Sequence, residues 1–96
     1  MSFRAESIPR RREGSDGQRF GADFVVMEPE GRMLRGLNDT AARIWELSDG
    51  KRTARDIAGV VALEYGVDVE RVLGDSLRLL EQLAGHGLLD AVEVLR

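Results

Sequence analysis

The segment from Arg32 to Ser48, RMLRGLNDTAARIWELS, constrains the fold more than any other part of the chain. Its first part, Arg32 to Leu37, predicts a short strand, and its second part, Asn38 to Ser48, predicts a helix. Asn38 is a preferred N-cap residue, because its side-chain oxygen accepts a hydrogen bond from a backbone N–H of the first helical turn. A strand that runs into a helix without a linker must lie against the helical part of the fold. We expect one edge of this strand to be left open.

Two strands are predicted ahead of this segment. Aromatic and β-branched residues predict a strand at Phe24 to Glu28, and Gln18 to Phe20 predicts a shorter one before it. Pro29 and Gly31 occupy the positions preferred in a type I turn, so the Arg32 to Leu37 strand returns beside Phe24 to Glu28. Ser15-Asp16-Gly17 predicts another turn. A single hairpin is barely stable in water, so these strands must pack on helices.

Two predicted helices show clear signals at their ends. The first ends at Asp49-Gly50, because Gly is common just beyond a helix. The second begins at Thr53, which forms an approximate capping box with Asp56, and ends at Gly66. The spacing places on one side of the first helix Ala41, Ile44, Trp45 and Ser48. The predicted buried side of the second helix contains Ile57, Val60, Val61 and Tyr65.

The third predicted helix begins at Asp68 and runs to about Gly85-His86-Gly87, and Leu88 to Val94 follows as a short extended or helical segment. Its apolar face spans roughly 160°, wider than one core contact requires. The face consists of two stripes: Val72, Ser76, Leu79 and Leu83, and beside them Leu73, Leu77, Leu80 and Ala84. Two interpretations stay open: both stripes belong to the core, or the second stripe lines a groove beside the Arg32 to Leu37 strand.

Composition and the absence of motifs exclude several kinds of site. The chain has 96 residues, enough for one small domain, with no cysteine and one histidine. No Cys, His and carboxylate residues have metal-ligand spacing, and no nucleophile and base form a plausible catalytic set. We therefore expect no catalytic residues, no metal, no cofactor and no enzymatic activity.

Charge and hydropathy bear on partners and location. The formal net charge of −3 argues against nucleic acid as the main partner. No apolar run reaches the length of a membrane span, and the N-terminus lacks a signal-peptide core, so we expect no membrane partner. The absence of cysteine fits a reducing cytoplasm.

The N-terminal segment is polar and rich in arginine. Residues 1–13 carry Arg4, Arg10, Arg11 and Arg12. The sequence predicts a flexible basic tail here, ahead of a domain at residues 14–96, because termini without apolar anchors stay loose. An arm that contacts nucleic acid or an acidic partner is the alternative.

One pattern resembles a known family. It reads L-N-x-x-A-x-x-I-W-x-L-x-D-G-x-x-T-x-x-D-I from Leu37 to Ile57, and D-x-x-x-L-L-x-x-L-x-x-x-G-L-L from Asp75 to Leu89. These residues resemble the PqqD-like family, the peptide chaperones of pyrroloquinoline quinone biosynthesis. The wider group comprises the recognition elements of ribosomally made, post-translationally modified peptides. The first strand departs from the family pattern, because SDGQRF is more polar than usual.

The resemblance implies an α+β fold, in which an N-terminal three-stranded antiparallel sheet precedes a three-helix bundle in a winged-helix-like layout. It also implies that the leader region of a precursor peptide adds as a strand between the third strand and the third helix. Family members present this peptide to a modifying enzyme, often a radical SAM protein. The candidate peptide-binding residues are Arg32, Met33, Leu34, Arg35, Gly36, Leu37, Leu73, Ser76, Leu77 and Leu80.

Two other functions compete with this interpretation. A winged-helix DNA binder would use the third helix for recognition, but that helix is acidic and rich in apolar residues, which suits a phosphate-lined groove poorly. An interaction module would use the open strand edge for pairing with its own copy. The chain is therefore expected to be a monomer or an edge-paired or domain-swapped dimer.

Overall fold

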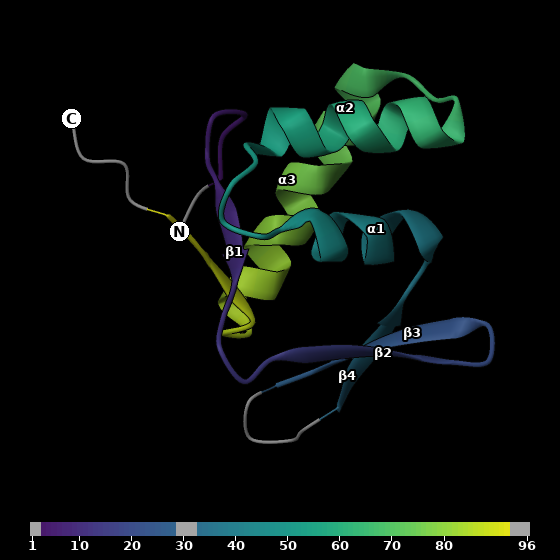
Figure 1. Cartoon of the computed structure of the whole chain (residues 1–96), viewed down its shortest axis with the longest axis vertical. Helices are drawn as coiled ribbons and strands as arrows, with labels where there is room; N and C mark the ends of the chain where they lie inside the picture. The colour runs from purple at the N-terminus through teal and green to yellow at the C-terminus, as the bar shows by residue number, and fades with distance from the viewer. Residues whose placement is uncertain (1–2, 29–32, 93–96) are drawn as a thin grey trace.

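The computed structural model describes residues 3–28 and 33–92 and combines strands with helices (Figure 1). The strands are β1 (Pro9–Arg11), β2 (Asp16–Phe20), β3 (Asp23–Met27), β4 (Met33–Leu37) and β5 (Leu89–Ala91). The helices are α1 (Asp39–Leu47), α2 (Ala54–Tyr65) and α3 (Val69–Gly85). The predicted α+β class is confirmed, with a three-stranded antiparallel sheet in the order β2-β3-β4 ahead of the three helices.

The elements are arranged along the long axis of the molecule. Figure 1 shows the three-stranded sheet at one end, α2 at the other end and α1 between them. The helix α3 extends from the level of α2 toward the sheet, and β1 and β5 lie beside its C-terminal half. The sheet contacts the helices mainly through α1, which follows β4 and carries the Trp45 ring approached by Gly17.

The predicted helix starts are confirmed by their caps. The Asn38 side chain accepts a hydrogen bond from the backbone N–H of Ala41 at 2.9 Å. Thr53 and Asp56 form a reciprocal capping box at the start of α2, and the Asp68 side chain caps α3. Gly66 ends α2 with φ of 66°, a left-handed conformation that a residue with a Cβ adopts at a cost.

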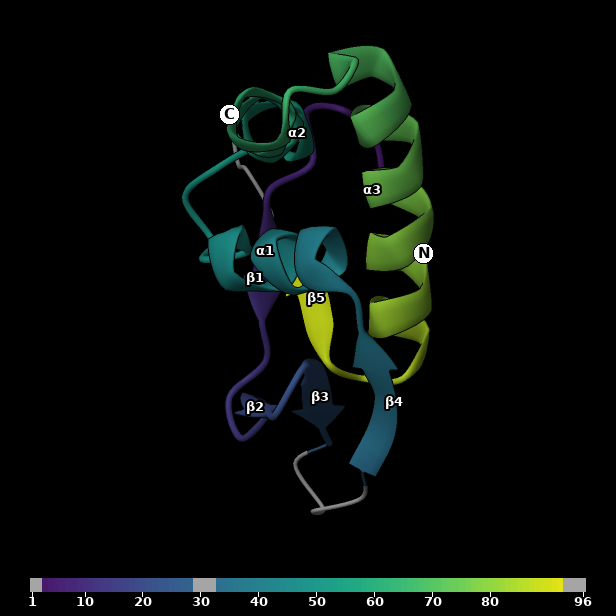
Figure 2. The ribbon, with the colours of Figure 1, turned by 90° about the vertical axis from the view of Figure 1, so that its right-hand side faces the viewer.

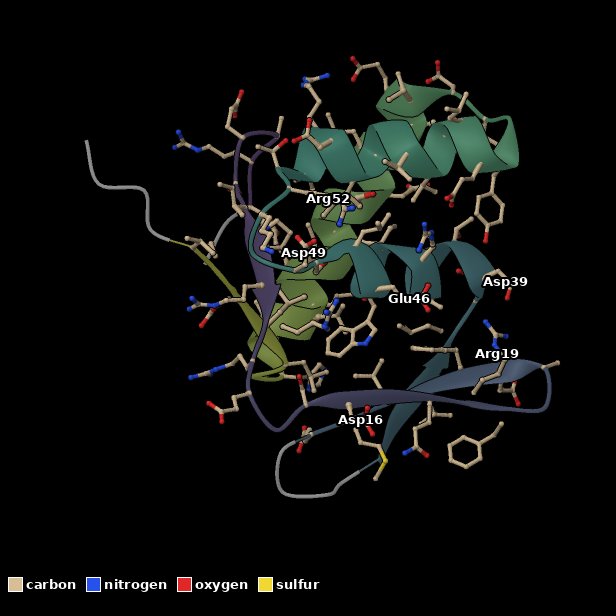
Figure 3. The ribbon with its side chains drawn as sticks, viewed as in Figure 1. Asp16, Arg19, Asp39, Glu46, Asp49 and Arg52 are labelled. Carbon is tan, nitrogen blue, oxygen red and sulfur yellow. The ribbon has the colours of Figure 1, made fainter. Side chains whose placement is uncertain are left out.

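The structure corrects the predicted turn at Ser15-Asp16-Gly17, because Gly17 lies inside β2, opposite Val26. A Cβ at Gly17 would lie 2.6 Å from the ring of Phe24 and 2.7 Å from Nε1 of Trp45. Glycine is needed here for close approach, so that the strand can lie directly on two buried rings. At the far end of β2, Arg19 pairs with Asp39 of α1 at 3.6 Å (Figure 3).

The predicted flexible tail is wrong for the described residues 3–13. Phe3 is 5% exposed and belongs to the core, and β1 pairs antiparallel with β5. The backbone carbonyls of Ala5 and Ser7 accept hydrogen bonds from the first turn of α2, whose N–H groups have no partner within the helix. The segment is therefore part of the folded domain.

Arg11 fixes this segment to α1. Its guanidinium donates to the backbone carbonyls of Trp45 and Glu46, at 2.8 and 2.6 Å, and lies over the Trp45 ring, 5.9 Å from the ring centre. Those carbonyls lie in the last turn of the helix, where the helix dipole favours a cation. The Trp45 carbonyl also accepts the backbone N–H of Ser48. A residue predicted to be a solvated charge is thus a C-terminal cap supplied from a distant segment.

The core lies between α1, α2, α3 and the inner face of the sheet. Its most deeply buried side chains include Val26, Ile57, Val61, Leu80, Leu88 and Leu89. In α2 the predicted stripe is wrong at one position, since Tyr65 is 44% exposed. Ala54, Ala58 and Ala62 are buried instead. These small side chains let α2 pack closely on its neighbours. Tyr65 lies outside this buried face.

Candidate peptide-binding site

The strand β4 forms one end of the three-stranded sheet. Its backbone pairs with β3 on one side, with Leu37 opposite Phe24 and Gly36 opposite Val25. On its other side β4 has no strand partner in residues 3–28 and 33–92. The N–H and C=O groups along that side need water or another chain as partners. The edge can therefore accept an added strand.

β4 is held at both its partner edge and its C-terminal end. Only Asn38 separates Leu37 from the first residue of α1, and Asn38 is fixed by its own capping bond. Leu37 is partly buried and packs against the core. A strand fixed in this way loses little conformational freedom when a ligand pairs with it, which favours binding.

The helix α3 lies on the same side of the molecule as β4. Figure 2 shows β4 beside the C-terminal half of α3, whereas β1 and β2 lie on the opposite side. The sequence interpretation placed the binding cleft between these two elements. The structure brings both elements to one side, as that interpretation requires.

The predicted α3 residues differ in accessibility. Leu73 is 6% exposed, and Ser76 and Leu80 are 0% exposed. The Ser76 hydroxyl donates to the Val72 carbonyl, so its polar group is already satisfied. Leu77 alone of the four is partly exposed. Leu73 and Leu80 of the second stripe are therefore core, and Leu77 is the predicted residue with surface left for a ligand.

The predicted strand residues are described to different extents. Arg32 lies outside the described residues. The backbones of Met33, Leu34 and Arg35 lie in β4, and their side chains lie outside the described part. Gly36 is exposed, and together with Leu37 it lines a shallow hollow of about 610 Å³ at the junction with α1.

A second hollow lies between α1 and the N-terminal half of α3. It has a volume of about 470 Å³ and is lined by Thr40, Ile44, Val67, Asp68, Arg71, Val72 and Asp75. The sequence interpretation missed this hollow, because it forms where two helices from separate segments diverge. Arg71 at the start of the third helix gave no specific signal in the sequence, because that helix also carries Arg78.

Other kinds of site receive no support from the described residues. In residues 3–28 and 33–92, no three His, Cys, Asp or Glu side chains are grouped so that they could hold a metal ion. Within the same ranges, every helix is too short or too polar to cross a membrane.

Comparison with known proteins identifies the family. The family model of coenzyme PQQ synthesis protein D (PqqD) matches residues 23–89, which include β3, β4, all three helices and the first residue of β5. This chain belongs to the PqqD family. A PqqA binding protein of Rhodopseudomonas palustris (strain HaA2) is 35% identical over 66 residues, which cover 69% of this chain and 63% of that relative.

Solved structures agree with this assignment to the PqqD family. One is the PqqD truncation of Methylobacterium extorquens PqqCD, a stand-alone recognition element for ribosomally made peptides. The match covers 93% of this chain and 95% of that structure, with TM-score 0.81 and 27% identity. Another is TbiB1 in complex with the TbiA(beta) leader peptide. This match covers 88% of this chain and 99% of that structure, with TM-score 0.71 and 26% identity. A lasso peptide synthetase B1 complexed with its leader peptide shares the fold at TM-score 0.72 and 24% identity, covering 86% of this chain and 98% of its own.

Proposed function

We propose that this PqqD-family chain binds the leader region of a ribosomally synthesised precursor peptide along β4 and presents it to a modifying enzyme. The observation that carries the proposal is the open edge of β4, held rigidly against β3 and α1. A peptide that adds as a strand gains backbone hydrogen bonds along this edge, and pockets for alternate side chains supply specificity.

The relatives support this proposal. TbiB1 is complexed with a leader peptide, the Methylobacterium protein is described as a functional recognition element, and the Rhodopseudomonas relative is named for binding PqqA. The matched region spans 63% of the Rhodopseudomonas relative, so its partner comes to this chain only as part of the proposal. The peptide-binding candidates that we keep are the β4 backbone, the exposed Gly36, and the partly buried Leu37 and Leu77.

The direct test is amide chemical-shift mapping by NMR with candidate precursor peptides, PqqA among them. We expect the largest changes at Met33 to Leu37 and on the Leu77 side of α3, because the added strand lies between these elements. Changes confined to residues 3–13 or to α2 would rule out this site. Self-association through the same edge would instead appear as concentration-dependent shifts of β4 without peptide.

Leu77→Asp tests the helical wall of the site. Replacing this partly exposed leucine by a carboxylate removes apolar surface from the groove, and we expect peptide affinity to fall by about tenfold. Leu63→Asp is the matched control, because Leu63 is 86% exposed on α2, far from β4. Circular dichroism of both variants separates lost binding from lost folding. Equal affinity of the two folded variants would remove Leu77 from the site.

We infer further that the chain is a carrier and that the chemistry belongs to a partner enzyme such as a radical SAM protein. The family assignment supports this, since the matched relatives are described as peptide-binding or recognition proteins. The test compares peptide modification by the partner enzyme with and without this chain, and by this chain alone. Turnover by the chain alone would contradict the inference.

A further inference from the structure

The hollow between α1 and α3 has an apolar floor. Ile44 of α1 and Val72 of α3 form this floor and are 4% and 8% exposed. Val67, in the turn before α3, is 48% exposed and stands at the rim. The volume of the hollow, about 470 Å³, falls within the usual range of small ligand pockets. An apolar side chain that entered the hollow would cover Val67 and complete the contacts of the floor.

One cation at this hollow is left free by its surroundings. Of the two acids beside it, Asp68 accepts the backbone N–H of Arg71, and Asp75 pairs with Arg78. The exposed guanidinium of Arg71 has no hydrogen-bond or ion-pair partner in residues 3–28 and 33–92. By contrast, Arg43 and Arg55 pair with acids of neighbouring helices. A guanidinium with five free donors is suited to bind a carboxylate through two parallel hydrogen bonds.

The hollow continues the path of β4. Asn38 alone separates β4 from α1, and Thr40 in the first turn of α1 lines the hollow. In Figure 2, β4 enters α1 at the end of the helix that lies beside α3. An extended peptide advances about 3.3 Å per residue, so a chain paired with β4 that continues past Leu37 reaches the hollow within a few residues.

We propose that the hollow binds an apolar side chain of the same peptide that pairs with β4, and that Arg71 binds a carboxylate close to that side chain. This inference rests on the proposed function and specifies its ligand. The peptide class recognised here is an extended segment with an apolar residue and an Asp or Glu near the end that lies beside α1. Asp68 and Asp75 do not compete with the peptide for the Arg71 guanidinium, because Asp68 accepts a backbone N–H and Asp75 pairs with Arg78.

The test uses a phage-displayed library of short random peptides selected on the full chain. We expect peptides enriched in an Asp or Glu at a fixed spacing from an apolar residue. The same selection on Arg71→Glu should lose this acid and favour Lys or Arg at its position. A synthetic peptide whose selected acid is replaced by Lys should bind the unchanged protein about tenfold more weakly and recover on Arg71→Glu.

Two control variants separate the hollow from general charge effects. Arg55→Glu changes the net charge equally but lies outside the hollow, so its selected peptides should match those of the unchanged chain. Val67→Asp should reduce the apolar preference while leaving the exposed turn intact. Loss of the acid preference in Arg55→Glu would overturn the role of Arg71.

The outcomes distinguish this inference from the proposed function. Selected peptides that shift the β4 amides in NMR but carry no preferred acid would overturn the inference and leave the proposed function standing. Selection of no peptide that contacts β4 would overturn both. An acid preference that reverses with Arg71→Glu, in peptides that contact β4, supports both.

Discussion

Gly17 determines how closely the sheet approaches the helices. The two rings that a Cβ there would meet belong to Phe24 and Trp45, which are 7% and 3% exposed and so cannot move outward freely. The absence of a side chain at this single position lets β2 cover Trp45. Adding a group to a filled core is destabilising, because neighbouring side chains or the backbone must shift.

We predict that Gly17→Ala lowers the free energy of unfolding by about 1–3 kcal/mol, because the added methyl group must displace a buried ring. Urea unfolding followed by Trp45 fluorescence measures the change. Gly59→Ala is the control, since a Cβ at Gly59 meets nothing within 4 Å. This helical substitution should raise stability by up to about 1 kcal/mol. A neutral Gly17→Ala would show that the rings rearrange freely.

Asp49 links stability to pH. Its carboxylate accepts the backbone N–H of Lys51 at 2.9 Å and pairs with Arg52 at 2.6 Å (Figure 3). The hydrogen bond from Lys51, with the charge of Arg52, holds the pKa of Asp49 below its ordinary value. A lowered folded-state pKa means that the stabilisation is complete above the unfolded-state pKa and is lost as the pH falls through the folded-state pKa.

We therefore predict that Asp49→Asn destabilises the chain by about 1 kcal/mol at neutral pH, since the charge-assisted part of these bonds is removed. The difference between the two proteins should shrink as the pH falls below the ordinary pKa of an aspartate. Urea unfolding at a series of acidic pH values measures it. A difference that stays constant across the series would mean that Asp49 does not titrate in this range.

At the scale of elements, β1 and β5 join the two ends of the described chain. Their pairing places Pro9 opposite Ala91 and Arg11 opposite Leu89. The same N-terminal segment caps α1 through Arg11 and supplies acceptors to α2. It thereby connects β5, α1 and α2, and β5 is separated from the other two in sequence by the whole of α3.

We predict that removal of residues 1–13 costs at least about 2 kcal/mol, because Phe3 alone buries a full aromatic side chain. Thermal unfolding of the truncated and full chains tests this. Phe3→Ala should reproduce part of the loss, whereas Arg4→Ala, an exposed neighbour, should change little. A truncated chain as stable as the full chain would restore the interpretation of these residues as a tail.

The open edge of β4 gives a second prediction at this scale. Leu34→Pro removes one backbone N–H from the middle of the strand. If that group faces the open edge, peptide affinity should fall by about five- to tenfold with little change in unfolding. If it faces β3, stability should fall instead. Isothermal titration and urea unfolding of the same sample distinguish these cases, and a variant unchanged in both would remove Leu34 from the pairing segment.

At the scale of the whole molecule, the charge distribution disfavours nucleic acid. The net charge is −3, and within α3 Arg78 is engaged by Asp75. Arg43 and Arg55 are likewise held by acids. Binding to DNA depends on Lys and Arg side chains that neutralise its phosphates. Guanidinium groups that already have carboxylate partners contribute less to this neutralisation.

We predict that any DNA binding is weak and independent of sequence. A gel-shift assay at physiological salt should give a Kd no tighter than about 10⁻⁶ M, the tight end of non-specific binding. Competition with unrelated DNA serves as the control. Tighter, sequence-selective binding would favour the winged-helix DNA-binding interpretation over peptide recognition.

The sequence by itself determined the local structure of this protein. The caps at Asn38, Thr53 and Asp68 and the change of period at Leu37 located the strand–helix junction and the helix starts, because these signals act over a few neighbouring residues. The motif from Leu37 to Ile57 indicated the family and, with it, the open strand as the candidate site. Local signals also explain why Gly17 was assigned to a turn. Glycine beside Ser and Asp locally favours a turn, and the adjacent residues do not reveal the two rings that require glycine in the strand.

Only the tertiary structure decided which apolar faces are covered and where distant segments meet. Leu80 and Leu77 are both apolar positions of one helix stripe, yet Leu80 is in the core and Leu77 is partly exposed. The N-terminal segment appeared solvated, because its partners β5, α1 and α2 lie tens of residues away. Capping and periodicity depend on adjacent residues, so the sequence could predict them. Burial and long-range pairing depend on the arrangement of all elements at once, so only the tertiary structure could show them.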